Sequence, residues 1–221
     1  MSDDVWSRPG LGVRDRRFVT IVCVSAAVDG PAMDDHVYAA LAGGELTLEQ
    51  LNELTLHFAV YCGWPRASQL EMTVRTQWQR LHDERGEPAP PFPVRGVDDL
   101  GIPDPAERIA AGVRCFEDVN LIGAPSQDSP YFHAGILNYV FGHLWLRPGL
   151  TRRERRLVTI PCVGVSDAIG PIWSHVTSAL GSGDVSYDEM QELVRHFAVY
   201  AGRRRAQVLQ EVAARWQAES G

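Results

Sequence analysis

The hexapeptide Trp-Ser-Arg-Pro-Gly-Leu at residues 6–11 decides how the rest of the chain is interpreted, because it returns as Trp-Leu-Arg-Pro-Gly-Leu at residues 145–150. When each residue from 6 to 67 is set against the one 139 positions later, 28 of the 62 positions are identical. Internal repeats are sought before other features, because overlooking one leads to the wrong fold. A period near 139 residues is too long for a solenoid and predicts two tandem units.

The identical positions fall in three clusters, at residues 14–24, 36–41 and 57–63 of the first copy. Their polar members are the most informative, because a polar side chain inside an apolar helix needs a partner or a function. In the first copy these are Arg14, Arg16, Arg17, Thr20, His36, His57 and Tyr61, which match Arg153, Arg155, Arg156, Thr159, His175, His196 and Tyr200 in the second.

The composition excludes several classes of function. Apolar residues make up 45% and charged residues 22% of the 221 residues, as in an ordinary soluble globular protein. The net charge of −7 argues against a nucleic-acid or membrane-surface partner, which would require a basic face. All 21 basic residues are arginine, so lysine Schiff-base chemistry is excluded.

The cysteines and histidines show none of the spacings of a metal or disulfide framework. The four cysteines form no CxxC pair, and no HxxxH or HExxH occurs, so we expect no metal site. The first residues, Met-Ser-Asp-Asp, lack the features of a signal peptide, and no apolar run approaches the ~18 residues of a membrane span. The sequence therefore predicts a cytoplasmic protein that binds a small molecule.

Apolar residues recur at three- and four-residue spacing through both copies, which predicts an all-α fold. Capping-box patterns begin at Thr47, Thr151 and Ser186, and Asp104-Pro105 is a typical helix start. We expect a first unit at 1–85 that is truncated at its front, a Pro/Gly-rich linker at 86–105 and a second unit at 106–221. In the first copy we expect a helix at 13–28, one around His36 that ends near 43, one through 47–61 and one through 70–81. The second copy should have equivalent helices. Two further helices are expected at 106–121 and 131–145, and the latter carries His133 and His143 on nearly the same face.

His36 and His175 occupy equivalent places in a short helix, four residues before a small alanine. Each is either a core histidine bonded to a backbone carbonyl or a catalytic group. His57 with Tyr61, and His196 with Tyr200, are i, i+4 pairs on one helical face. Such a pair can offer a hydrogen-bond donor to a carbonyl and an acid or base near neutral pH, or it can be a satisfied polar pair between helices.

Six further residues are candidates for substrate binding. Arg16 and Arg155 lie on inward-facing helices, where each is either in an ion pair or a clamp for an anionic substrate. Cys62 becomes Ala201 in the second copy and Trp64 becomes Arg203, so two pockets would differ. Cys62 is either structural or a nucleophile that needs a nearby base. The remaining two candidates are Trp6 and Trp145.

Taken together, these motifs resemble the carboxymuconolactone decarboxylase family within the alkylhydroperoxidase D-like superfamily. The resemblance is carried by the W-x-R-P-G-L stretch, the arginine-rich turn at 14–24, the histidine at 36–41, the capped helix at 47–50 and the A-x-Y-x-G-x-P ending at 59–65, with a second set at 145–202. It implies two tandem helical units of that superfamily and a homo-oligomer, a trimer or a dimer.

The resemblance also implies an activity, that of a lyase or isomerase in aromatic or polyketide metabolism. A histidine or tyrosine would donate to the oxygen of an enolate left by CO2 loss from a small cyclic lactone or keto acid, with no cofactor. Isomerisation or dehydration would use the same groups. Two alternatives stay open: a peroxidase-like protein that uses Cys62, and a non-catalytic ligand binder or scaffold.

Overall fold

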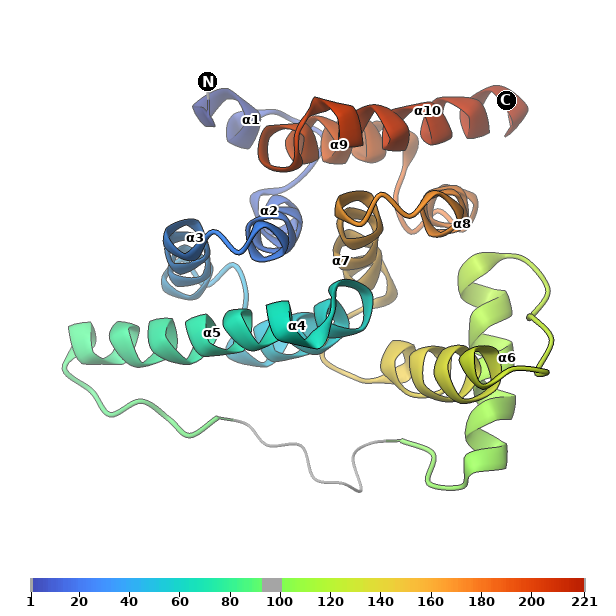
Figure 1. The fold of residues 1–221 in the computed structure, drawn as a ribbon. Helices are drawn as coiled ribbons and strands as arrows, with labels where there is room; N and C mark the ends of the chain where they lie inside the picture. The colour runs from blue at the N-terminus through green and yellow to red at the C-terminus, as the bar shows by residue number, and fades with distance from the viewer. Residues whose placement is uncertain (1, 93–100, 221) are drawn as a thin grey trace.

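The computed structural model describes residues 2–92 and 101–220, which fold into helices with no strand among them (Figure 1). The predicted all-α class is confirmed. None of the helices in these described ranges is long and apolar enough to cross a membrane. Residues 93–100 of the predicted linker lie outside the described residues.

The helices of the two copies have nearly the same bounds when 139 is added to the first. In the first copy they are α2 (Val13–Ala27), α3 (Gly30–Ala42), α4 (Leu48–Cys62) and α5 (Trp64–Arg85). In the second copy they are α7 (Arg152–Val165), α8 (Ile169–Gly181), α9 (Tyr187–Ala201) and α10 (Arg203–Ser220). The offset is 139 at both ends of the α3 and α8 pair and of the α4 and α9 pair.

The three predicted capping boxes are present and begin α4, α7 and α9. Thr47, Thr151 and Ser186 each accept a hydrogen bond from the backbone N–H three residues later. The side chain of that later residue accepts a hydrogen bond from the backbone N–H of the capping residue. These bonds satisfy donors that a helix start leaves free, and losing such a cap costs about 0.5–2 kcal/mol. The Asp104 cap at the start of α6 (Pro105–Asn120) is also present.

The predicted helix at 131–145 is wrong after Phe141. A π-helix, η2 (Tyr131–Phe141), ends before Gly142, and a short 3-10 turn, η3 (Leu144–Leu146), follows. A Cβ at Gly142 would lie 2.6 Å from the backbone oxygen of Arg108 on α6, so the chain turns where the two helices approach closely. His143 lies beyond η2 and shares no helix with His133.

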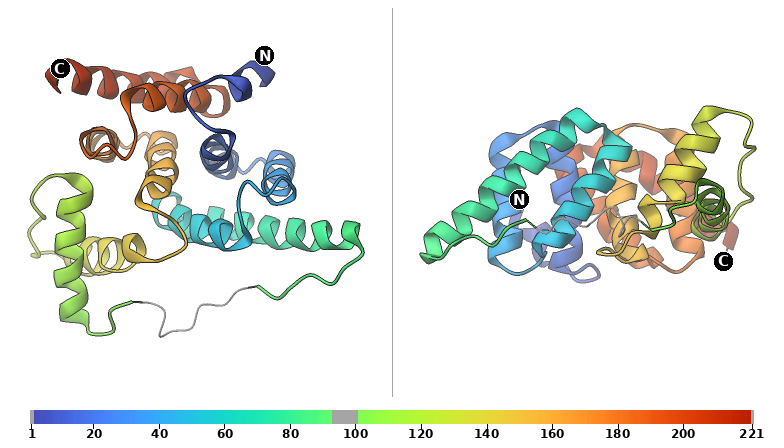
Figure 2. Two further views of the ribbon diagram at one scale, coloured as in Figure 1. Left: turned by 180° about the vertical axis from the view of Figure 1, so that it is seen from behind. Right: turned by 90° about the horizontal axis from the view of Figure 1, so that it is seen from below.

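The helices are arranged in layers (Figures 1 and 2). Helices α3, α2, α7 and α8 form a middle layer, with α4 and α5 on one side and α9 and α10 on the other. The packing crosses between copies, because α4 packs on α7 and α9 packs on α2. One continuous core results, and its fully buried members include Phe18, Phe58, Leu157 and Phe197. Each such side chain contributes roughly 1.5–3 kcal/mol by its burial.

Helices α6 and η2 make a smaller cluster beside this core, formed by Val119, Val140, Phe141 and Trp145. They pack against each other, and α6 also packs on α8 of the second copy. The corresponding place before α2 holds only α1 (Ser2–Ser7), which lies on α9. The unit boundaries at 85 and 105 stay a prediction, but the crossed packing means that residues from both copies build each polar cluster described below.

Candidate functional site

Two equivalent polar clusters lie where helices of the two copies cross. We call the first the Tyr61 site, made of Tyr61, His57, Trp145, Thr159 and His175. The second, the Tyr200 site, is made of the equivalent residues Tyr200, His196, Trp6, Thr20 and His36. In each, the indole Nε1 donates a hydrogen bond of 2.9 Å to the tyrosine oxygen of the other copy.

Behind Tyr61, a chain of hydrogen bonds has a fixed direction. The Nη1 of Arg155 lies 3.3 Å from Nδ1 of His57, and the Nε2 of His57 lies 2.7 Å from the hydroxyl of Thr159. Because a guanidinium only donates, Nδ1 must be the acceptor and Nε2 must carry the proton. His57 is fully buried and its pKa is well below the ordinary value, first because of burial and then because of Arg155. The imidazole is therefore neutral and donates to Thr159.

The Tyr61 hydroxyl stands at the end of this chain. The indole of Trp145 can only donate, so the Tyr61 oxygen accepts that bond, and the hydroxyl of Thr159 is a second hydrogen-bond partner. Because His57 already donates to Thr159, the threonine proton is available for the Tyr61 oxygen. The phenolic proton is then left for a ligand. Burial raises the pKa of Tyr61, which keeps that proton in place at neutral pH.

His175 stands beside Tyr61, with ring centroids 5.7 Å apart, and stacks on Trp145 at 6.1 Å with an interplanar angle of 4°. It is only 6% exposed, and its Nδ1 has no hydrogen-bond partner among the described residues. Burial, and then the charge of Arg156, lower its pKa to about 3. Arg156 is turned away to the carboxylate of Asp184 and the hydroxyl of Ser178. A neutral imidazole with a free nitrogen remains.

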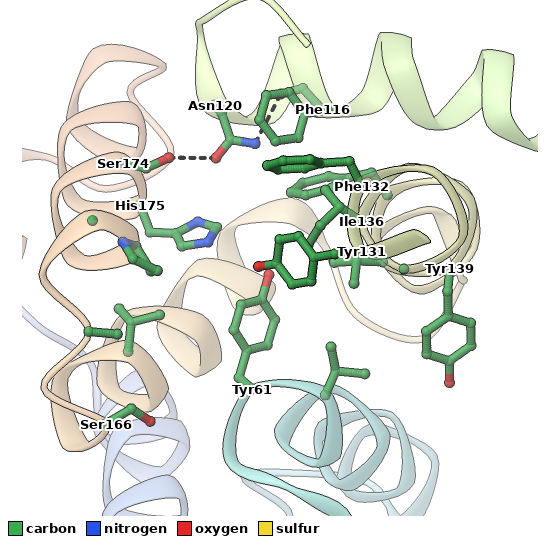
Figure 3. A pocket seen from close by; sticks show the side chains of 18 residues that line it. Tyr61, Phe116, Asn120, Tyr131, Phe132, Ile136, Tyr139, Ser166, Ser174 and His175 are labelled. Atoms are coloured by element: carbon green, nitrogen blue, oxygen red, sulfur yellow. Dashed lines mark hydrogen bonds between the residues drawn. The ribbon is translucent and has the colours of Figure 1, made fainter. Parts of the chain in front are cut away.

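Figure 3 shows the cavity into which His175 and Tyr61 point. It has a volume of about 590 Å³ and lies between α4, α8, α6 and η2. No charged side chain is among the residues that line it. Asn120 and Ser174 add polar groups at one end, where the Ser174 hydroxyl donates to Oδ1 of Asn120 at 2.8 Å. The apolar wall includes Phe116, Phe132, Ile136, Val140, Phe141 and Val163.

The Tyr200 site differs at its histidine. The Nη1 of Arg17 lies 2.8 Å from Nδ1 of His36, and the same guanidinium contacts both carboxylate oxygens of Glu45 at 2.5 and 3.2 Å. Nδ1 of His36 must therefore accept from Arg17. Burial and then Arg17 lower the pKa of His36, and Arg17 also lies over the ring of Trp6 at 4.5 Å. This histidine is held by the protein itself.

The two arginines predicted either to pair with carboxylates or to clamp substrate are both buried away from the cavity. The Arg155 side chain is 1% exposed, donates to the carbonyl oxygen of Arg147 at 2.6 Å and lies 3.8 Å from the Glu53 carboxylate. Arg16 donates to the carbonyl oxygens of Leu11 and Arg8. The structure places both as supports of the W-x-R-P-G-L turns.

Trp64 and Cys62 are likewise not brought to the cavity. Trp64 is 59% exposed at the start of α5, because its side chain points off the helix into solvent. Cys62 ends α4 with its Sγ 3.8 Å from the carbonyl oxygen of Cys162. A hydrogen bond with the thiol of Cys162 lowers the pKa of Cys62, while burial opposes this and raises the pKa of Cys162.

Sequence reasoning missed several residues of the site. Thr159 stands among the repeated polar residues, because it is identical to Thr20 at the 139-residue offset, but it was not predicted as a site residue. The same signal marks Glu53, whose carboxylate holds Arg147 at 2.6 Å. Asn120 belongs to helices that are not repeated, so no such signal marks it. No group of three or more His, Cys, Asp or Glu among the described residues is placed to hold a metal.

Comparison with known proteins finds a family that part of this chain resembles. The model of the carboxymuconolactone decarboxylase family matches residues 1–71. The resemblance inferred from the sequence is thereby confirmed for this segment, which contains His36, His57 and Tyr61 but not His175.

Two relatives within this family match the same part of the chain. A 4-carboxymuconolactone decarboxylase of Acinetobacter baylyi is 35% identical over 71 residues, which are 32% of this chain and 52% of the relative. A nitrosuccinic acid decarboxylase of Metarhizium robertsii is 36% identical over 67 residues, 30% of this chain and 46% of the relative. The chain thus spans about half the length of these relatives.

Proposed function

We propose that this chain is a cofactor-independent enzyme that carries out decarboxylation or isomerisation of a small cyclic keto or lactone compound at the Tyr61 site. One observation carries the proposal: Nδ1 of His175 is buried and unpartnered beside a phenol whose proton is free for a ligand. The names of the two relatives, both decarboxylases, support a decarboxylase-like activity.

The chemistry follows from the directions of the hydrogen bonds. Tyr61 donates its proton to the carbonyl oxygen of the substrate, where negative charge develops as an enolate forms. In an isomerisation, Nδ1 of His175 takes a proton from the adjacent carbon and returns it to another atom of the enolate. In a decarboxylation, the bond between the substrate carbon and its carboxylate breaks, CO2 leaves, and the electrons of that bond remain on the substrate as an enolate. An acid then protonates the enolate carbon. Positioned acid–base groups of this kind contribute roughly 10²–10⁴-fold to a rate.

The test is a product assay on a panel of cyclic β-keto acids, lactone acids and their uncharged ketone counterparts, read by mass and by CO2 release. We expect Tyr61→Phe to lower kcat/KM at least 100-fold for any substrate that turns over. The matched control is Tyr200→Phe, which removes the equivalent hydroxyl from the other site and should change kcat/KM less than threefold. Turnover that survives Tyr61→Phe, or tight binding with no turnover of any member, would contradict the proposal.

Assembly is part of the same proposal: the chain forms a homo-oligomer, a trimer or a dimer. Large apolar side chains exposed on the chain, including Ile169 at the start of α8 and Met72 on α5, would be covered in such an assembly. Light scattering after size exclusion measures the mass. A mass of one chain, 24.5 kDa, over the micromolar range contradicts this part.

A second candidate function is thiol peroxidation, and it is favoured by the lowered pKa of Cys62 beside the thiol of Cys162. In that reaction the Cys62 thiolate attacks the terminal oxygen of a hydroperoxide, the O–O bond breaks with release of an alcohol, and Cys62 becomes a sulfenic acid. The Cys162 thiol then forms a disulfide with that sulfur and releases water. A peroxide-reduction assay with an added dithiol reductant tests it. Loss of the rate in Cys62→Ser would support this reading, and an undetectable rate in the wild type would contradict it.

A further inference from the structure

We infer that the Tyr61 site takes an uncharged, flat, largely apolar ketone, of two or more fused rings, and that it isomerises this compound by proton transfer. This inference rests on the proposed function and names its substrate class. It departs from a carboxylate substrate, which the resemblance to the decarboxylase family suggested. Three features of the cavity carry it.

The first feature is the absence of charge around the cavity. Its lining contains no arginine, aspartate or glutamate, and the chain has no lysine. The arginines behind the cavity are engaged elsewhere: Arg147 with Glu53, Arg155 with the carbonyl of Arg147, and Arg156 with Asp184. A carboxylate moved into such an environment without a counter-charge loses hydration worth several kcal/mol.

The second feature is the kind of polar atom that faces the ligand. His175 lines the cavity as a neutral imidazole, one ring nitrogen of which is an acceptor that repels the lone pairs of a carboxylate and attracts a C–H or O–H proton. Asn120 and Ser174 already bond to each other, and the Asn120 amide also donates to the carbonyl of Phe116 at 3.0 Å. The polar groups that line the cavity are therefore neutral, and the phenols of Tyr61, Tyr131 and Tyr139 are donors that suit a carbonyl oxygen.

The third feature is the shape of the wall. Aromatic rings from α6 and η2 line one side, and Phe116 meets Phe141 edge to face at 4.9 Å (Figure 3). A volume of about 590 Å³ is well above what a single six-membered ring fills and lies in the usual range for larger organic ligands. Flat rings gain the most from such walls, because aromatic pairs add about 0.5–1.5 kcal/mol beyond buried area.

The reaction balances without any added reagent. The substrate ketone carries a carbon–carbon double bond in the β,γ position. The acceptor nitrogen of His175 removes a proton from the α-carbon between that double bond and the carbonyl, and the C–H electrons form a new double bond to the carbonyl carbon. The carbonyl π electrons move to oxygen, which is stabilised by the proton of Tyr61. The imidazolium then gives its proton to a different carbon of the enol system, which yields the isomer and restores both side chains.

A matched pair of ligands tests the charge preference. 2-Acetylnaphthalene and 2-naphthoate have the same rings and nearly the same outline, and they differ in whether the side group is a ketone or a carboxylate. We expect the ketone to bind at least tenfold more tightly at pH 7.5, measured by isothermal titration calorimetry on the full chain. Equal binding, or tighter binding of naphthoate, overturns the inference.

Variants of the cavity wall locate the effect. Ile136→Arg places a positive charge in the cavity and should weaken the binding of the ketone and strengthen the binding of naphthoate, each by at least fivefold. Phe132→Arg is the second variant, to be used if Ile136→Arg unfolds at a low temperature. A ketone affinity unchanged in both variants shows that the ligand lies elsewhere and overturns the inference. These outcomes are distinct from failure of the proposed function, because charge preference is read from binding, whereas that function fails when turnover survives Tyr61→Phe.

Discussion

The Tyr61 and Tyr200 sites share one polar frame and differ in what that frame holds. The indole-to-tyrosine bond is 2.9 Å in both, and the contact between threonine and histidine is 2.7 Å in both. The sites differ at the first histidine, because Nδ1 of His57 accepts from Arg155 whereas Nδ1 of His196 has no hydrogen-bond partner among the described residues. They differ at the second histidine as well. The carboxylate of Glu45 binds Arg17 in such a way that Nη1 of Arg17 still reaches Nδ1 of His36. In the other site the shorter Asp184 and the hydroxyl of Ser178 bind the equivalent Arg156, which does not reach His175.

The surroundings of the two sites differ as well. Helices α6 and η2, which have no counterpart in the first copy, supply the apolar wall beside Tyr61. At the Tyr200 site the corresponding front consists of the six-residue α1. The repeated indole, threonine and histidine can therefore hold a tyrosine in place at either site. A histidine without an arginine partner that lines a cavity requires two more features, Asp184 in place of Glu45 and the wall made by α6 and η2.

The largest expected effect separates the two histidines. His175→Gln should lower kcat/KM by about 10²–10⁴-fold, because it removes the buried nitrogen that exchanges the proton with substrate. His36→Gln is the matched control, and we expect less than a threefold change, because that nitrogen already accepts from Arg17. Steady-state kinetics on a substrate from the panel measures both. Equal losses of kcat/KM in the two variants would contradict the assignment of the reaction to the Tyr61 site.

The next effect concerns the two glutamates that hold the W-x-R-P-G-L turns. Glu53 and Arg147 are both buried, so Glu53→Gln should lower the free energy of unfolding by about 3–5 kcal/mol. Glu192 is also buried and its partners are the buried Arg16 and the more exposed Arg8 and Arg195, so Glu192→Gln should cost less, about 1–3 kcal/mol. Urea unfolding measures both values. A larger loss for Glu192→Gln would be inconsistent with this asymmetry.

Acid should destabilise the protein through its neutral histidines. The pKa of His175 and of His196 falls from the ordinary 6.5 to about 3, because of burial and then of neighbouring arginines. The stability from each is present above pH 6.5 and is lost as the pH falls towards 3, amounting to about 2 kcal/mol per histidine between pH 8 and pH 5. Urea unfolding at the two pH values measures it. His175→Gln should remove about 2 kcal/mol of this change, and His36→Gln should leave most of it. A pH-independent stability would contradict the account.

The smallest effect tests the chain of bonds behind the tyrosine. Thr159→Val leaves Nε2 of His57 without its acceptor and should lower kcat/KM about tenfold, because Tyr61 loses the partner that directs its proton. Thr20→Val makes the same change behind Tyr200 and should lower the rate less than twofold, although both variants lose about 1–3 kcal/mol of stability. An unchanged kcat/KM in both variants would show that Thr159 does not position Tyr61.

Much of the fold followed from local patterns in the sequence. The capping boxes at Thr47, Thr151 and Ser186 predicted helix starts to the residue, because the cap is a local hydrogen bond. The break after Phe141 was missed. It depends on the close approach of Gly142 to α6, a contact between distant residues that periodicity does not encode.

The candidate site was predictable only in part. The repeat singled out His57, Tyr61 and His175, and the structure brings these three together. It could not show that Trp145 and Thr159 reach Tyr61 from the other copy, because the crossing of α4 on α7 is a property of packing. Cys62, Trp64 and the buried arginines Arg16 and Arg155 were also candidates for substrate binding, and none of them lines the cavity at Tyr61.

The most direct test of the account is a crystal structure of the chain with 2-acetylnaphthalene. We predict that the ketone lies between α4, α8, α6 and η2, with its carbonyl oxygen within hydrogen-bond distance of the Tyr61 hydroxyl and its methyl group towards Nδ1 of His175. A ligand seated instead beside His36 and Tyr200, or one that leaves the cavity at Tyr61 empty, would contradict the assignment of the active site.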